Sequence, residues 1–153
     1  MTHAPPFAAP ALTGGEPVSL AGLVSDGPIV LAFFKVSCPT CQLAFPFLER
    51  LHAGASTGLR FIGVSQDAPN LTRQFAARYG VTLPLLLDTA AEAYRVSNAY
   101  GLTHVPAIFV IETDGAISHS WAGFSRSDFE KLALRAGTAA FRHEDSVPLW
   151  KPG

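Results

Sequence analysis

The chain has 153 residues, of which 48% are hydrophobic and 15% charged, so its composition is that of a folded globular protein and excludes a disordered one. A formal net charge of −1 gives no electrostatic reason to expect nucleic acid or a membrane as a partner. No apolar run reaches the length of a membrane span. We expect one domain over residues 1–153, with its core over about 16–136.

The first residues carry three prolines and no basic start, which is untypical of a secretion signal. The sequence therefore predicts an extended segment over 1–15, closed by a Gly14-Gly15 turn. It also favours a cytoplasmic location, where thiols rest mostly reduced. A chain that had lost an export signal would instead belong outside the cytoplasm.

Apolar periodicity then predicts alternating strands and helices. A continuous apolar run over 29–34 is typical of a strand covered on both faces. Asp114-Gly115 lies between two apolar segments and predicts a hairpin, whereas Ser127 and Glu130 form a capping-box pattern at a helix start. The predicted strands cover 18–20, 29–34, 59–65, 83–87, 107–111 and 116–121, and the predicted helices cover 39–53, 69–79, 90–100 and 127–136.

This order predicts an α/β fold with a central mixed β-sheet flanked by helices on both faces. A proline, Pro46, falls inside the first long helix and is expected to kink it. Residues 137–153 are polar, contain proline and show no periodicity, so they form a C-terminal tail without a predicted structure.

The two cysteines of the chain occur in one motif, Cys38-Pro39-Thr40-Cys41, between the predicted buried strand and the predicted helix. A structural bridge there would close a loop of about four residues and contribute roughly 2 kcal/mol, which a domain of this size does not need. The pair is therefore expected to be reactive, as a C-x-x-C motif inside a βαβ pattern indicates.

The position of the motif assigns a role to each thiol. A helix N-terminus stabilises an anion through its free N–H groups and its macrodipole, and the nucleophile in disulfide exchange is a thiolate. Pro39 suits the first helical position because its missing N–H would have no partner there. We expect Cys38 to attack a disulfide and Cys41, nearly one turn later, to resolve the mixed disulfide.

Half of a zinc site is the alternative reading of the motif. Zinc needs four ligands, but the chain has no second cysteine pair, and none of its five histidines lies at ligand spacing from another. We therefore expect no metal and no cofactor other than a redox-active Cys38–Cys41 disulfide.

Several segments resemble the thioredoxin superfamily, in particular its TlpA-like redoxin branch, which is related to the alkyl hydroperoxide reductase and thiol-specific antioxidant proteins. The resemblance covers about residues 18–136. It rests on the segments 33–41, 42–46 and 61–65, on a helix-plus-strand insertion over 69–88, and on Val105-Pro106. It implies a thioredoxin-like fold, thiol–disulfide exchange and a role in redox homeostasis.

The resemblance also implies a substrate groove. Pro106 would be cis and face the active site, and the backbone of Val105 would pair with the substrate chain. The implied partners are oxidised or reduced protein thiols, with thioredoxin reductase or another thiol reductant as electron source.

The sequence departs from the family at three positions. Thioredoxins carry a buried Asp where this chain has Ala32, and TlpA-like proteins often carry a Glu where it has Ala44. The usual Trp before the first cysteine is Ser37. We therefore expect no carboxylate in place to take the proton of Cys41.

Three neighbouring residues have open roles. Lys35 could stabilise the Cys38 thiolate or simply extend into water, and His104 could transfer a proton or lie on a surface loop. Thr40 could tune the reduction potential of the motif or serve only in the first helical turn.

Two other functions remain as alternatives to disulfide exchange. A thioredoxin-dependent peroxidase would resemble peroxiredoxins, which set a Thr or Ser three residues before the reactive cysteine and a Pro four further back. Lys35 and Leu31 stand at those positions. A non-catalytic binding module that uses the groove is the third candidate.

Overall fold

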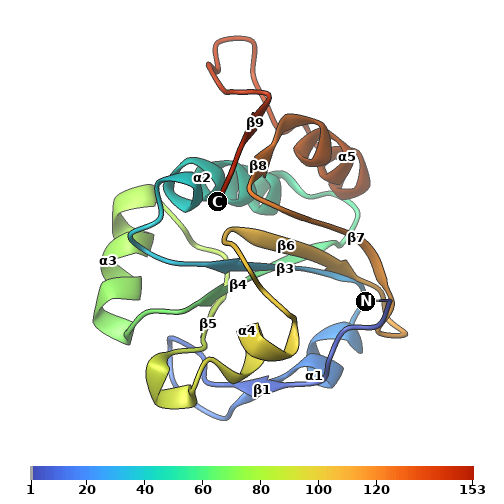
Figure 1. Cartoon of the computed structure of the whole chain (residues 1–153). Helices are drawn as coiled ribbons and strands as arrows, with labels where there is room; N and C mark the ends of the chain where they lie inside the picture. Colours follow the sequence, from blue (N-terminus) through green and yellow to red (C-terminus); the bar gives the residue numbers. More distant parts are fainter. Residues whose placement is uncertain (1) are drawn as a thin grey trace.

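The computed structural model describes residues 2–153 and contains a five-stranded mixed sheet in the order β5-β4-β3-β6-β7 (Figure 1). Its central strand pairs in parallel with β4 and antiparallel with β6, so the predicted mixed sheet is confirmed. The strands are β3 (Ile29–Phe34), β4 (Arg60–Ser65), β5 (Leu85–Leu87), β6 (Ala107–Ile111) and β7 (Ile117–Ala122).

Helices cover both faces of this sheet, as the element order predicts. Figure 1 shows α2 (Pro39–Gly54) and α5 (Arg126–Ala136) on one side, and α1 (Leu20–Val24) and α4 (Arg95–Ala99) on the other. Helix α3 (Pro69–Tyr79) joins the α2 side through Phe75, which belongs to the same hydrophobic cluster as α2.

The apolar run of β3 explains why the core divides into two layers. Successive side chains of a strand point to opposite faces, so alternate residues enter different clusters. Val30, Ala32 and Phe34 pack beneath α2, α3 and α5. Ile29, Leu31 and Phe33 pack against α1, α4 and the first segment of the chain, and every residue of β3 is buried.

The prediction of one continuous helix over 90–100 is wrong. A 3-10 turn, η1 (Ala90–Glu92), is followed by Ala93 and Tyr94 with left-handed φ values of 56° and 48°, and α4 starts only at Arg95. The buried carboxylate of Asp88 accepts hydrogen bonds from the N–H groups of Val96 and Ser97. This side chain caps a new helix and thereby breaks the predicted one.

Two other helix starts differ from the prediction. Ser125, and not Ser127, caps α5, because its hydroxyl accepts a hydrogen bond of 3.3 Å from the N–H of Asp128. The predicted strand over 18–20 ends at Ser19, which caps α1 by accepting a hydrogen bond of 3.0 Å from Gly22. In both cases a serine in extended conformation ends a short strand and starts a helix.

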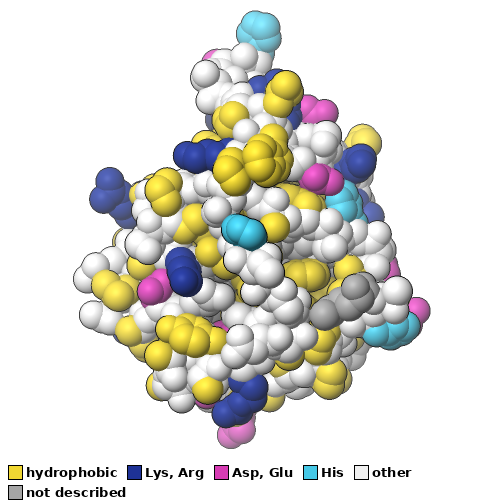
Figure 2. Space-filling model, viewed as in Figure 1, with side chains coloured by type: hydrophobic (Ala, Val, Ile, Leu, Met, Phe, Trp, Pro, Cys, Tyr) yellow, Lys and Arg dark blue, Asp and Glu magenta, His cyan; other side chains and the backbone are white. Residues whose placement is uncertain are grey.

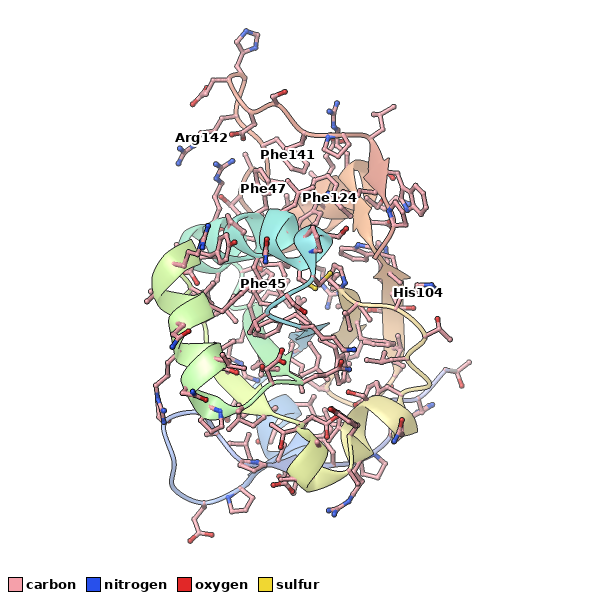
Figure 3. All side chains as sticks on the ribbon, turned by 60° about the vertical axis from the view of Figure 1, so that its left-hand side comes forward. Phe45, Phe47, His104, Phe124, Phe141 and Arg142 are labelled. Carbon is pink, nitrogen blue, oxygen red and sulfur yellow. The ribbon has the colours of Figure 1, made fainter. Side chains whose placement is uncertain are left out.

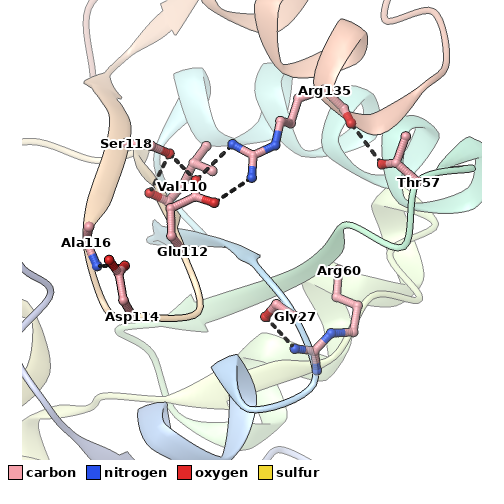
Figure 4. Close-up of polar contacts among 9 residues, drawn as sticks. All are labelled: Gly27, Thr57, Arg60, Val110, Glu112, Asp114, Ala116, Ser118 and Arg135. Carbon is pink, nitrogen blue, oxygen red and sulfur yellow. Dashed lines mark hydrogen bonds and ion pairs between the residues drawn. The ribbon is translucent and has the colours of Figure 1, made fainter.

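The predicted hairpin is confirmed (Figure 4). The N–H of Gly115 donates to the carbonyl of Glu112 over 2.9 Å, and the Asp114 carboxylate accepts from the N–H of Ala116 over 2.9 Å. Arg135 of α5 then binds the Glu112 carboxylate at the same end of the sheet.

The first and last segments are more ordered than the sequence predicts. In the first segment, β1 (Ala8–Ala9) pairs antiparallel with β2 (Val18–Ser19), which follows it. The last segment contributes β9 (Trp150–Lys151), which pairs with β8 (Phe124–Ser125) and brings the chain end beside the start of α2 (Figure 1). None of the helices described over residues 2–153 has the length and apolar character needed to cross a membrane.

Candidate active site

The cysteine motif lies at the junction of β3 and α2. Cys38 is the N-cap of α2 with extended backbone, and its Sγ accepts a hydrogen bond of 3.2 Å from the N–H of Cys41. Pro39 opens the helix, as its fixed φ and missing donor favour. Figure 3 shows both sulfur atoms at this end of the helix. A thiolate at Cys38 would thus meet a free helix N–H and the positive end of the macrodipole.

The two thiols have different surroundings. Cys38 is half-buried, whereas Cys41 is fully buried within the cluster under α2. Burial raises the pKa of the Cys41 thiol, and its hydrogen bond with Cys38 raises it further. Cys41 is therefore a neutral thiol at neutral pH.

The loop before β6 faces the motif. The Val105–Pro106 peptide bond is cis, as the family resemblance implies. The Cys38 thiol donates to the carbonyl of Val105 over 3.5 Å, which is within the range of a sulfur hydrogen bond. The backbone of Val105 therefore borders the half-buried sulfur.

Two side chains that the sequence analysis did not single out hold the loop before Cys38. The Asp67 carboxylate accepts a hydrogen bond of 2.8 Å from the N–H of Val36, and the Gln42 amide donates to the Val36 carbonyl over 2.9 Å. Asp67 is the second residue after the end of β4. Adjacent parallel strands place their carboxyl ends at the same edge of the sheet. The sequence could therefore have predicted that Asp67 lies near the cysteine motif.

The two positions where related proteins carry a carboxylate hold alanine here, but the negative charge of the Asp67 carboxylate still acts on Cys41 and contributes to its raised pKa. Ala32 and Ala44 are buried in the same cluster as Cys41, so both positions offer only methyl groups. Ser37 is exposed in the turn before the motif.

Lys35 and His104 come together, but not at a sulfur. Both line a hollow of about 300 Å³ beside Val105. His104 lies on the loop between α4 and β6 (Figure 3), where its Nδ1 is 3.0 Å from the Thr103 hydroxyl. Over residues 2–153, neither side chain is hydrogen-bonded to Cys38 or Cys41. Their roles stay predictions.

Thr40 has a partner that the sequence did not predict. Its side chain is buried, and its hydroxyl donates a hydrogen bond of 2.6 Å to the carbonyl of Pro152. The last segment of the chain therefore reaches the cysteine motif.

The part of the chain that the structure describes contains no group of three or more His, Cys, Asp or Glu side chains arranged to hold a metal ion.

Comparisons with known proteins connect this geometry to a family. Residues 1–120 match the model of the AhpC/TSA family. The thiol-disulfide oxidoreductase ResA of Halalkalibacterium halodurans is 32% identical over 105 residues, which cover 67% of this chain and 57% of ResA. The chain thus spans little more than half the length of that relative.

Two other similarities complete the comparison. A Mycobacterium tuberculosis protein described as a peroxiredoxin is 34% identical over 124 residues, covering 74% of this chain and 78% of that protein. The crystal structure of a Chlorobium tepidum protein described as the thiol:disulfide interchange protein DsbE superposes with a TM-score of 0.75. It is 24% identical and covers 88% of this chain and 92% of its own, and it supports the thioredoxin-like fold.

Proposed function

This chain belongs to the AhpC/TSA family, and we propose that it is a thiol–disulfide oxidoreductase whose Cys38–Cys41 pair exchanges with the disulfides of proteins or small molecules. The proposal rests on the different surroundings of the two cysteine sulfur atoms. A half-buried Cys38 caps α2 beside the Val105 carbonyl, and a fully buried Cys41 follows one turn later.

The exchange proceeds in two balanced steps. The Cys38 thiolate attacks one sulfur of the substrate disulfide, which forms a mixed disulfide and releases the other substrate sulfur as a thiolate. Cys41 then loses its proton to water and attacks the Cys38 sulfur of the mixed disulfide. This second step releases the remaining substrate thiol and leaves a Cys38–Cys41 disulfide. The substrate gains two electrons and the protein loses two.

Each neighbouring element has a part in this mechanism. The N–H of Cys41 and the macrodipole of α2 stabilise the Cys38 thiolate before attack. Proximity favours ring closure, because both sulfurs belong to one helical turn. Val105 and Pro106 would border the substrate disulfide, and thioredoxin reductase or another thiol reductant would regenerate the dithiol.

A thioredoxin-dependent peroxidase is the second candidate, favoured by the similarity to the Mycobacterium tuberculosis peroxiredoxin. Two side chains argue against efficient peroxide chemistry. Leu31 is fully buried inside β3, and Lys35 offers no hydroxyl where peroxiredoxins place one. Disulfide exchange therefore has the stronger support.

Parallel kinetics with the reduced protein test the two candidates. We expect rapid reduction of insulin disulfides, sustained by thioredoxin reductase or dithiothreitol, and slow consumption of hydrogen peroxide in stopped flow. Cys38→Ser is the control, and it should abolish both reactions. Fast peroxide turnover without insulin reduction would favour the peroxidase instead, and an inactive chain that still binds a disulfide peptide would favour the binding module.

The direction of electron flow depends on the reduction potential of the pair. Equilibration with glutathione buffers of known ratio measures this potential. A strongly negative value would indicate a reductant, which suits the predicted cytoplasmic location, and a high value would indicate an oxidant. The location itself stays a prediction from the sequence.

A further inference from the structure

We propose that residues 150–153 act as an intramolecular occupant of the substrate groove, which an extended polypeptide must displace before its disulfide reaches Cys38. We call these four residues the closing segment. The inference rests on the proposed function and specifies its substrate class, an extended polypeptide.

The closing segment is bound as an added strand along the site. Trp150 and Lys151 form β9 and pair antiparallel with Phe124 and Ser125 of β8. The next residue, Pro152, accepts the hydrogen bond from the Thr40 hydroxyl at 2.6 Å. An extended chain therefore runs from the edge of β8 to the cysteine motif, which is the backbone geometry of strand addition.

The last residue lies against the backbone of Val105. A Cβ placed on Gly153 would be 2.0 Å from the Val105 carbonyl oxygen, so only glycine fits there. Gly123 also lies against this segment, because a Cβ there would be 2.6 Å from the Lys151 carbonyl oxygen. The closing segment thus contacts the backbone of both Val105 and Gly123, and a chain that takes the same space must replace it.

The same carbonyl contacts both the reactive thiol and the closing segment. The Cys38 Sγ lies 3.5 Å from the Val105 oxygen, on which Gly153 packs. A substrate chain that pairs with Val105 and presents a disulfide to Cys38 needs this space. Occupation by the closing segment and by substrate is therefore mutually exclusive.

The closing segment is attached more weakly than the chain before it. Phe141 packs on Phe47 and Phe124 with ring centroids 5.0 and 6.1 Å apart (Figure 3). Arg50 also pairs with Asp145 over 2.6 Å. These contacts fix the tail before it reaches the site. Displacement can therefore be confined to the last residues.

The side chains near the closing segment contribute little burial. Leu149 and Trp150 remain 74% and 61% exposed, and Figure 2 shows hydrophobic side chains gathered at the surface over this end of the chain. Backbone hydrogen bonds, each of which contributes little net stability, thus hold most of the closing segment. An occupant bound in this way can exchange with a competing peptide.

The test uses the full-length chain with Gly153→Leu, whose side chain cannot fit against Val105. If the groove of the wild type is free in about a tenth of molecules, displacement raises the apparent affinity for an extended substrate about tenfold. We expect this change in KM for a disulfide-containing peptide, with kcat preserved. The matched control is Leu149→Ser, which alters an exposed side chain next to the closing segment and should behave as wild type.

A second readout does not depend on catalysis. Amide hydrogen exchange at Trp150 and Lys151 should accelerate in Gly153→Leu, and a synthetic peptide with the sequence of residues 147–153 should bind this variant more tightly than the wild type. Unchanged hydrogen exchange, or faster exchange with an unchanged KM, would overturn the proposal. Absence of disulfide reduction in every form would contradict the proposed function alone, because peptide binding and hydrogen exchange would still report on the closing segment.

Discussion

The carboxylate of Asp67 accepts a hydrogen bond of 2.8 Å from the N–H of Val36 and so joins the loops that follow β4 and β3. Asp67 is itself held, because its N–H donates to the Ser65 hydroxyl over 3.1 Å and its carbonyl accepts from Thr72 over 3.1 Å. The turn that presents Cys38 therefore depends on a side chain from the neighbouring strand.

Asp67→Ala should reduce disulfide exchange and stability together. Loss of the acceptor leaves the Val36 N–H without its partner, which costs about 1–3 kcal/mol. A misplaced Cys38 should lower kcat/KM by about tenfold, since proximity depends steeply on geometry. Urea unfolding and insulin reduction measure the two effects. Asp67→Asn, which retains an acceptor oxygen, should keep most of the activity, and an inactive Asn variant would show that the charge matters instead.

The two cysteines should respond differently to substitution by serine. Cys38→Ser removes the attacking sulfur and should abolish exchange, whereas Cys41→Ser should retain the first step and accumulate mixed disulfides. Mass spectrometry after incubation with a peptide disulfide detects the covalent adduct on Cys38. Full activity of Cys38→Ser would show that the assignment of roles is wrong.

The pH dependence of the second step should follow Cys41. Burial raises the pKa of this thiol, so its reactive thiolate becomes more abundant as pH rises, about tenfold per pH unit below the pKa. The rate of mixed-disulfide resolution should therefore increase between pH 6 and pH 9. Stopped-flow release of a fluorescent thiol from a preformed Cys38 adduct measures this rate.

A carboxylate introduced near Cys41 should flatten that pH profile. Ala44→Glu adds a proton acceptor one helical turn after Cys41, at the cost of burying a charged group, which destabilises the fold by several kcal/mol. Resolution at pH 7 should accelerate relative to the wild type. Ala32→Asp offers the same test from β3 if the first variant does not fold. Unchanged profiles in both variants would show that water suffices as acceptor.

The sequence predicts much of this molecule because several signals act over short distances. The apolar run of β3, the cysteine motif at a helix start and the Asp114-Gly115 turn are each determined by a few adjacent residues. The family resemblance predicts the cis bond before Pro106, whereas the residues alone favour the trans form.

The parts that the sequence does not predict depend on contacts between distant residues. Asp88 caps α4 from the end of β5, and no local pattern identifies it as a buried carboxylate and not a surface one. Thr40 meets Pro152 across 112 positions of the chain. A polar tail without periodicity gives no sign that it returns to the active site, since its pairing is supplied by the edge of β8.

The ion pair at the sheet end gives a pH dependence of stability with a definite sign. The two terminal guanidinium nitrogens of Arg135 donate to the Glu112 carboxylate, over 2.6 and 2.8 Å (Figure 4). These bonds lower the pKa of Glu112 from its value of 4.5. The stabilisation is therefore present above pH 4.5 and is lost as pH falls through the lower folded pKa.

Glu112→Gln should consequently destabilise the protein at pH 7, and this deficit should be smaller at pH 3, below the ordinary pKa of the carboxyl. The side chains of Arg135 and Glu112 are 41% and 29% exposed, so solvent screening limits the contribution to about 0.5–1 kcal/mol. Urea unfolding of wild type and variant at both pH values measures the difference. Glu130 is exposed on α5, the helix that carries Arg135. The control Glu130→Gln should therefore leave the free energy of unfolding unaltered at either pH. A deficit of Glu112→Gln that is as large at pH 3 as at pH 7 would indicate a packing effect, because loss of the carboxylate charge should reduce an ion-pair contribution.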